Sequence, residues 1–153
     1  MNMKNKKVFI LLLLILILII IGIMLFIKTG KPMRWAQSVN AEDIAKVELL
    51  VYPHSETDKP YKNFKSEEFD AVTEKINQCS GRFTLNPEQP VGVSFCYYIT
   101  MKNGDVHTVA NNGMELDIDG TFYTGNEEWL TQWVDSIMNE VDSPIPEDFA
   151  FEY

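Results

Sequence analysis

The chain has few of the residues on which enzymes most often rely. Among its 153 residues are two cysteines and two histidines, and it has no HExxH, GxSxG, CxxC or phosphate-binding glycine loop. A mechanism that depends on histidine or on an activated nucleophile therefore has little support. Acidic residues are abundant, so a small carboxylate-dependent hydrolase remains the enzymatic alternative. We expect a protein that is not an enzyme and that carries no cofactor and no metal site.

Positive charge is scarce in most of the chain. Residues 35–153 hold seven lysines and arginines against 22 acidic residues, which gives them a formal charge of −15. Such a region attracts cations and repels nucleic acid, so we expect no nucleic-acid partner. Its length suffices for one small hydrophobic core. Its strand-forming and aromatic residues are too frequent for a fully disordered tail.

The N-terminal part lacks acidic residues altogether and contains a long apolar run. Val8 to Ile27 is apolar throughout if one glycine is allowed, and as a helix it spans about 30 Å, the thickness of a hydrocarbon core. A cleaved signal peptide has a shorter apolar core with a small-residue site close behind it. We therefore expect residues 8–27 to be an uncleaved anchor in the lipid bilayer, after a short basic stub at residues 1–7.

The orientation of this anchor follows from its flanking charges. Three basic residues stand on each side, Lys4, Lys6 and Lys7 before it and Lys28, Lys31 and Arg34 after it. The count is tied, and the α-amino group favours a cytoplasmic N-terminus. We expect a single-pass protein of the cell membrane with residues 35–153 outside the cytoplasm. Residues 28–40 read as a juxtamembrane linker, in which Trp35 is either an interfacial aromatic or the first residue docked on the domain.

The expected soluble domain covers residues 41–141, followed by an acidic tail at residues 142–153. Alternating apolar residues predict a strand within 41–52, a polar loop follows at 54–63, and 82–86 is a short strand candidate. A helix is predicted to begin at Ser66. Its apolar stripe comprises Phe69, Val72, Ile76 and Cys79. A second helix, over about 126–141, has a wider stripe that includes Trp129 and Trp133, which we assign to the core rather than to a sugar-binding platform.

Two hairpins are predicted in the middle of the domain. Residues 91–110 alternate around Asn103-Gly104, a dipeptide that favours a two-residue turn. That turn would place Met101 opposite Val106, Thr100 opposite His107, Ile99 opposite Thr108 and Tyr98 opposite Val109. Asp119-Gly120 predicts a second such turn, with Ile118 opposite Thr121, Asp117 opposite Phe122 and Leu116 opposite Tyr123.

These elements predict an α+β fold. An antiparallel sheet of about five to six strands would carry two amphipathic helices on one face, beside the single N-terminal transmembrane helix. The expected buried face consists of Phe95, Tyr97, Ile99, Met101, Val106, Met114, Leu116 and Ile118. The expected outer face consists of Cys96, Tyr98, Thr100, His107, Val109, Glu115, Asp117 and Phe122. From this face we take Tyr98, His107, Val109, Glu115, Asp117 and Phe122 as candidate residues for binding a ligand or partner.

Blander interpretations of the same residues remain open. The outer face is also what an ordinary solvated sheet would show, and a register slip of one residue would invert the list. Glu115, Asp117 and Asp119 resemble the start of a calcium loop, but the twelfth position is Asn126 instead of a glutamate. The two cysteines are expected to be free thiols on different faces, although a disulfide closing seventeen residues would be permitted outside the cytoplasm.

The chain resembles a group of uncharacterised small domains of Firmicutes that are membrane-anchored or lipoproteins. The matching features are Trp35 before the first strand, Pro53 after it, the first helix, Asn103-Gly104-Asp105, and the segment from Ile118 to Tyr123. The resemblance implies a membrane-tethered extracytoplasmic domain and brings no catalytic residues with it. The chain differs from the lipoprotein members because it has no acylated cysteine.

Two functions are therefore expected in different classes. The first is a non-catalytic, membrane-anchored binding or interaction module that takes a protein or peptide, cationic in view of the domain's charge. The second is a tethered inhibitor or immunity-type protein that sequesters a cationic peptide, toxin or enzyme. In both, electrostatic steering would weaken as salt rises.

Overall fold

The computed structural model describes residues 3–52, 58–87, 94–112, 115–125 and 127–149. The chain divides into two compact units, Met1–Lys31 and Pro32–Tyr153. The boundary falls within the first helix, at the only proline that this helix contains. Proline has no backbone N–H, so the helical hydrogen bond at this position is missing.

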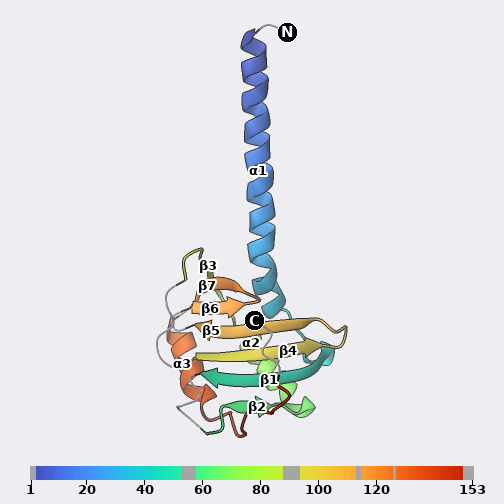
Figure 1. Ribbon diagram of the computed structural model, residues 1–153, viewed down its shortest axis with the longest axis vertical. Coiled ribbons are helices and arrows are strands. Elements are labelled where there is room, and N and C mark those ends of the chain that lie inside the picture. The colour runs from blue at the N-terminus through green and yellow to red at the C-terminus, as the bar shows by residue number, and fades with distance from the viewer. Residues whose placement is uncertain (1–2, 53–57, 88–93, 113–114, 126, 150–153) are drawn as a thin grey trace. The chain divides into compact units, whose positions relative to one another are not determined.

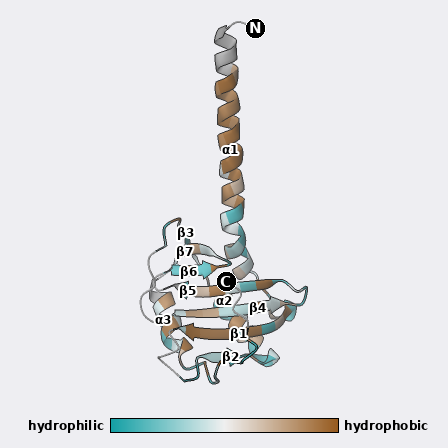
Figure 2. Ribbon diagram, in the orientation of Figure 1, coloured by the Kyte–Doolittle hydropathy of each residue, from teal (hydrophilic) through white to brown (hydrophobic). Residues whose placement is uncertain are grey.

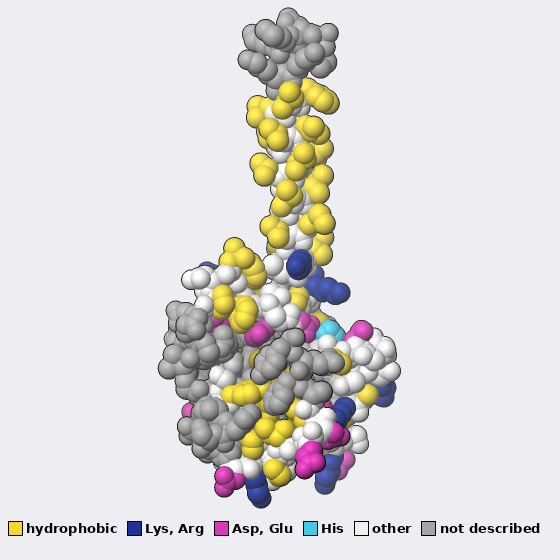
Figure 3. Space-filling view, viewed as in Figure 1, with side chains coloured by type: hydrophobic (Ala, Val, Ile, Leu, Met, Phe, Trp, Pro, Cys, Tyr) yellow, Lys and Arg dark blue, Asp and Glu magenta, His cyan; other side chains and the backbone are white. Residues whose placement is uncertain are grey.

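The first unit consists of most of helix α1 (Met3–Ala36). From Phe9 onward this helix is long and apolar enough to cross a membrane. Its large apolar side chains from Phe9 to Ile27 are all exposed, and Figure 3 shows hydrophobic side chains along the helix. Figure 2 shows the same stretch coloured as hydrophobic. The expected anchor at residues 8–27 is therefore helical throughout, and none of its side chains described from Phe9 to Ile27 is buried.

Residues 28–40 do not form the separate linker that the sequence predicted. Helix α1 continues to Ala36, and the second unit buries Met33, Ala36 and Val39 in its core. Trp35 is packed against the same core, which is the docked alternative of the two left open by the sequence. Glycine and proline in this stretch favoured a loop, but burial of apolar side chains outweighs those local preferences.

The second unit is an α+β domain, as predicted. Its antiparallel sheet has seven strands in the order β2-β1-β4-β5-β6-β7-β3 (Figure 1). The strands are β1 (Ile44–Tyr52), β2 (Tyr61–Asn63), β3 (Gly81–Phe83), β4 (Ser94–Met101), β5 (Val106–Asn112), β6 (Glu115–Ile118) and β7 (Thr121–Gly125). The strand beyond the predicted six is β2, which lies in the segment expected to be a polar loop.

Two helices pack on one face of this sheet. They are α2 (Phe69–Asn77), entered through the 3-10 turn η3 (Ser66–Glu68), and α3 (Glu127–Ile137); a second 3-10 turn, η1 (Ala41–Asp43), precedes β1. The predicted stripe of α2 is buried at all four positions, and α3 buries Leu130, Trp133 and Ile137. Both stripes belong to one core with the inward residues of the sheet, which confirms the two-layer arrangement and the core assignment of Trp129 and Trp133.

The second hairpin has the predicted register. Ile118 pairs with Thr121 and Leu116 pairs with Tyr123. Asp119 and Gly120 both have positive φ, 52° and 71°, as a two-residue turn of this type requires.

The first hairpin is shifted by one residue from the prediction. Thr100 pairs with Val106, and the backbone N–H of Met101 donates to the carbonyl oxygen of Asp105 at 2.8 Å. The loop therefore has three residues, with Gly104 at φ 92° as its last. Three-residue loops of this kind are the next most common hairpin connection after the two-residue turns.

This shift moves β5 to the opposite parity. Val106, expected to be buried, is 51% exposed, whereas Val109, expected on the outer face, is fully buried. His107 also lies on the helix-covered face, directly opposite Ile99. The remaining expected core residues Phe95, Tyr97, Ile99, Leu116 and Ile118 are buried and Met101 is partly buried, while Met114 lies outside the described residues.

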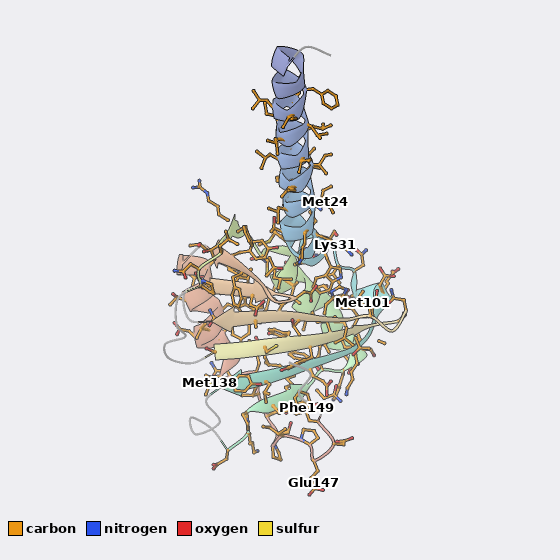
Figure 4. The ribbon with its side chains drawn as sticks, turned by 45° about the horizontal axis from the view of Figure 1, so that its top comes forward. Met24, Lys31, Met101, Met138, Glu147 and Phe149 are labelled. Atoms are coloured by element: carbon orange, nitrogen blue, oxygen red, sulfur yellow. The ribbon has the colours of Figure 1, made fainter. Side chains whose placement is uncertain are left out.

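The last described residues return to the sheet. Tyr61 and Ser143 form an antiparallel bridge, in which each backbone N–H donates to the other residue's carbonyl oxygen. Farther along lies Phe149, which is labelled in Figure 4. Its ring contacts the rings of Tyr61 and Tyr98. The segment expected to be an acidic tail thus contributes to the outer face of the sheet.

Candidate functional site

The structure separates the six predicted site residues. Tyr98 lies on the outer face of the sheet, as predicted, and Asp117 and Phe122 lie opposite each other on the same face, both half-buried. The face assignments of Val109 and His107 are wrong, and Glu115, although on the outer face, is not exposed. Val109 is in the core, Glu115 is buried, and His107 faces the helix layer. The one-residue shift of the first hairpin accounts for Val109 and His107.

The first candidate site is a groove on the outer face of the sheet. Its volume is about 370 Å³, which falls in the range of small-ligand pockets. One wall comes from the sheet and the other from the C-terminal segment. The groove is lined by Lys46, Glu48, Tyr61, Asn63, Tyr98, Thr100, Val106, Pro146, Asp148 and Phe149.

Glu48 carries the charge at the floor of this groove. Its side chain is only 12% exposed, and its Oε1 accepts hydrogen bonds from the Tyr61 hydroxyl at 2.5 Å and from Lys46 Nζ at 2.8 Å. Burial and this carboxylate together raise the pKa of Tyr61 above its usual range, so the hydroxyl remains a donor. The pairing on adjacent strands β1 and β2 fixes the geometry, because Leu50 pairs with Tyr61 and Glu48 with Asn63.

Aromatic rings line the rest of the groove. Phe149 meets Tyr61 edge-on with ring centroids 5.4 Å apart and Tyr98 edge-on at 5.3 Å. Such edge-to-face pairs are the favoured geometry of aromatic contacts. The rings hold the C-terminal segment on the sheet and give the groove apolar walls beside the Glu48 carboxylate.

A second hollow lies around His107. The ring of Trp35 stacks on His107 with centroids 3.9 Å apart and an interplanar angle of 19°. His107 Nδ1 is 2.7 Å from Asp119 Oδ2, and Asp119 Oδ1 accepts the backbone N–H of Thr108 at 2.9 Å. The hollow has a volume of about 510 Å³ and is lined by Trp35, Asp43, Met101, Lys102, Asn103, Asp105 and His107. The contact with Asp119 orients the imidazole.

Burial alters the protonation of both thiols and of Asp117. Both cysteines are free, and burial raises the pKa of Cys79 and of Cys96 to about 12, which keeps them protonated. Burial also raises the pKa of Asp117, with a hydrogen bond from the Gly120 backbone opposing the shift. Its Oδ1 is buried without a hydrogen-bond partner in the part of the chain that the structure describes.

The carboxylates that resemble a calcium loop do not converge. Glu115 and Asp117 lie on strand β6, and Asp119 in the turn bonds to His107 and Thr108. Within the described ranges, no three histidine, cysteine, aspartate or glutamate side chains are close enough to hold a metal ion together.

Sequence reasoning missed most of the groove. Glu48, Tyr61 and Phe149 are brought together by the pairing of β2 and by the return of the C-terminal segment, neither of which has a local signal in the sequence. The alternation of β4 placed Tyr98 on the outer face, where the structure has it. Comparisons of the chain with protein-family models, with curated proteins and with solved structures each give no match.

Proposed function

We propose that the chain is a membrane-anchored, non-catalytic binding protein whose outer-face groove takes a cationic segment of a peptide or protein. The groove itself is the observation that carries this proposal. It sets a nearly buried carboxylate, Glu48, among the rings of Tyr61, Tyr98 and Phe149. Lysine and arginine side chains are attracted both by carboxylates and by aromatic faces.

The charge of the domain supports a cationic partner. Residues 35–153 carry a formal charge of −15, and Asp148 adds a second carboxylate to the groove. A field of this sign accelerates encounter with positively charged partners and is screened by salt. Lys46 already pairs with Glu48, so an incoming cation would displace or share that contact.

Helix α1 supports the anchor. Its exposed apolar surface is stable only in lipid or a similar environment, and Lys28, Lys31 and Arg34 follow it as residues that favour the membrane surface. We place the N-terminus in the cytoplasm and the second unit outside the cell membrane. The resemblance to small tethered domains of Firmicutes agrees with this arrangement and stays a prediction.

The decisive experiment is a binding titration on the full chain in lipid nanodiscs. The probe is a fluorescent peptide of alternating lysine and glycine, with a glutamate–glycine peptide of equal length as its counterpart. We expect Glu48→Gln to weaken binding of the lysine peptide about five- to tenfold, since an ion pair that is largely desolvated contributes more than an exposed one. Glu42→Gln removes an equal charge from an exposed position outside the groove and is the matched control.

The aromatic wall has its own matched pair. Tyr98→Leu should also weaken binding, whereas Phe122→Leu, on the same sheet face but outside the groove, should leave it unchanged. Equal affinities for Glu48→Gln and Glu42→Gln, or equal binding of both peptides, would remove the groove as the binding site.

A tethered inhibitor or immunity-type role is the second candidate, and the excess of acidic residues over the whole domain favours it. In that role the domain would neutralise a cationic, membrane-active peptide by its general charge. Vesicles that contain the full chain would then leak less dye when melittin is added, and Glu48→Gln and Glu42→Gln would reduce the protection equally. The response to these two variants therefore distinguishes the candidates.

A further inference from the structure

Strand β3 presents apolar side chains that the domain leaves uncovered. Outside α1, the large apolar residues that the described structure exposes are Phe83 (42%), Leu85 (88%) and Val106 (51%). The first two are neighbours at the edge of the sheet, where β3 ends, and Figure 3 shows hydrophobic side chains gathered there. An exposed apolar edge strand invites unwanted pairing unless something covers it.

This edge lies beside the residues with which the second unit begins. Phe83 pairs with Tyr123 on β7, so both side chains lie on the helix-covered face. A backbone group of Met33 hydrogen-bonds to the Tyr123 side chain. Met33 is the second residue of the second unit, so the strand partner of Phe83 contacts the beginning of this unit.

The covalent chain limits how far this edge can be from lipid. Met33 comes six positions after Ile27, the last residue of the apolar run. Six steps along a helix rise about 9 Å, and the headgroup layer on each side of a bilayer is itself about 5–8 Å thick. A side chain adjacent to Met33 is therefore within reach of the interfacial layer when α1 spans the bilayer.

The charge around the edge also differs from that of the domain. Arg82 on β3 and Arg34 beside Met33 are both exposed. These two arginines accompany the apolar side chains within the second unit, although the rest of that unit is strongly acidic. Apolar side chains flanked by arginine and lysine are the composition that binds anionic lipid surfaces.

We propose that the segment Arg82–Leu85 inserts Phe83 and Leu85 into the interface of the bilayer that holds α1, with Arg82 at the phosphate level. This inference rests on the proposed anchoring by α1 and adds a second contact between the domain and the membrane. It makes the β3 edge a lipid-binding site, separate from the groove on the outer face.

The test places a fluorescent reporter at the edge of the intact protein. The full chain, Leu85→Trp and the control Asn63→Trp are reconstituted in vesicles of phosphatidylcholine and phosphatidylglycerol, with and without brominated acyl chains. Asn63 ends β2, the strand at the opposite edge of the sheet from β3. Both positions are exposed, so circular dichroism should be unchanged by either substitution. The emission that the new tryptophan adds to that of the unsubstituted chain should be quenched by about half or more at position 85 and should be unaffected at position 63.

The outcomes separate this inference from the anchor itself. If the chain does not float with the vesicles in a density gradient, the anchor is wrong and the inference falls with it. If the chain floats and position 85 is not quenched, the anchor stands and the lipid contact is overturned. Quenching that appears only after the protein is diluted tenfold in lipid would show that a second copy of the chain covers the edge at the higher protein density, and it would also overturn the inference.

Discussion

The two central hairpins, β4–β5 and β6–β7, turn on similar dipeptides with different backbones. Asp119 and Gly120 both adopt positive φ, while of Asn103 and Gly104 only the glycine does. In the first turn Asn103 Oδ1 accepts the backbone N–H of Asp105 at 2.9 Å, a local bond that favours a longer loop. In the second turn the Asp119 side chain bonds to the neighbouring strand instead.

The difference of one loop residue decides which side chains face the helices. The longer first loop turns His107 toward the helix layer, where Asp119 of the second turn meets it. With two residues in the first loop, His107 and Val109 would have faced outward and Val106 inward. The comparison shows that an asparagine–glycine or aspartate–glycine pair predicts a hairpin more safely than it predicts the register.

The largest expected effect tests that register directly. Val109→Asp should destabilise the protein by more than about 4 kcal/mol, because it places an unpaired charge in the core. Val106→Asp should change stability by no more than about 0.5 kcal/mol, since Val106 is exposed. Thermal unfolding of the full chain in detergent, followed by circular dichroism, measures both. A larger loss for Val106→Asp than for Val109→Asp would support the two-residue turn that the sequence predicted.

The glycines of the two turns give the next largest effect. Gly104→Ala and Gly120→Ala should each lower the free energy of unfolding by about 1–2 kcal/mol, because both glycines have positive φ. No atom lies within 4 Å of an added Cβ at either position, so backbone strain alone accounts for the expected loss. Asparagine tolerates the left-handed region near the φ of Gly120, so Gly120→Asn should recover more of the loss than Gly104→Asn. Chemical denaturation of the four variants measures their free energies of unfolding. Equal recovery of stability by asparagine at positions 104 and 120 would contradict the prediction.

The contact between the hairpins should contribute a smaller amount. Asp119→Asn keeps a residue that tolerates positive φ but removes the negative charge beside His107, and we expect a loss of about 1 kcal/mol. Asp105→Asn alters the exposed carboxylate of the first turn and should cost less. Nuclear magnetic resonance of the His107 ring reports whether its stacking on Trp35 loosens. Identical losses for the two variants would mean that the contact with His107 contributes nothing.

The smallest effect concerns the half-buried Asp117 in the second hairpin. Burial raises the pKa of Asp117 above its ordinary value of 3.8, so the folded protein binds this proton more readily than the unfolded chain. The stability linked to this group is therefore full below pH 3.8 and is lost as pH rises through the folded pKa. Asp117→Asn should raise stability at pH 7 by less than about 1 kcal/mol and leave it unchanged at low pH. A stabilisation that does not depend on pH would point to another cause.

The local patterns in the sequence predicted the local structure well. Both helical stripes, the alternation of β4 and the register of the second hairpin follow from periodicities of 3.6 and 2 and from a turn dipeptide. The groove did not follow, because Tyr61 and Phe149 are 88 residues apart and the stack of Trp35 on His107 joins the end of α1 to a hairpin. Contacts of this kind depend on the whole packing of the sheet.

The bridge between Tyr61 and Ser143 has a consequence for any partner of this domain. Strand β2 is the last strand on its side of the sheet, and the backbone of Ser143 already takes both hydrogen bonds that Tyr61 offers outward. A visiting peptide would find those main-chain groups occupied at this position and could not extend the sheet there by strand addition. Selectivity for a partner on this side of the sheet must then come from side-chain contacts. Such contacts accept many backbone conformations of the partner and distinguish partners by the charge and the aromatic rings of their side chains.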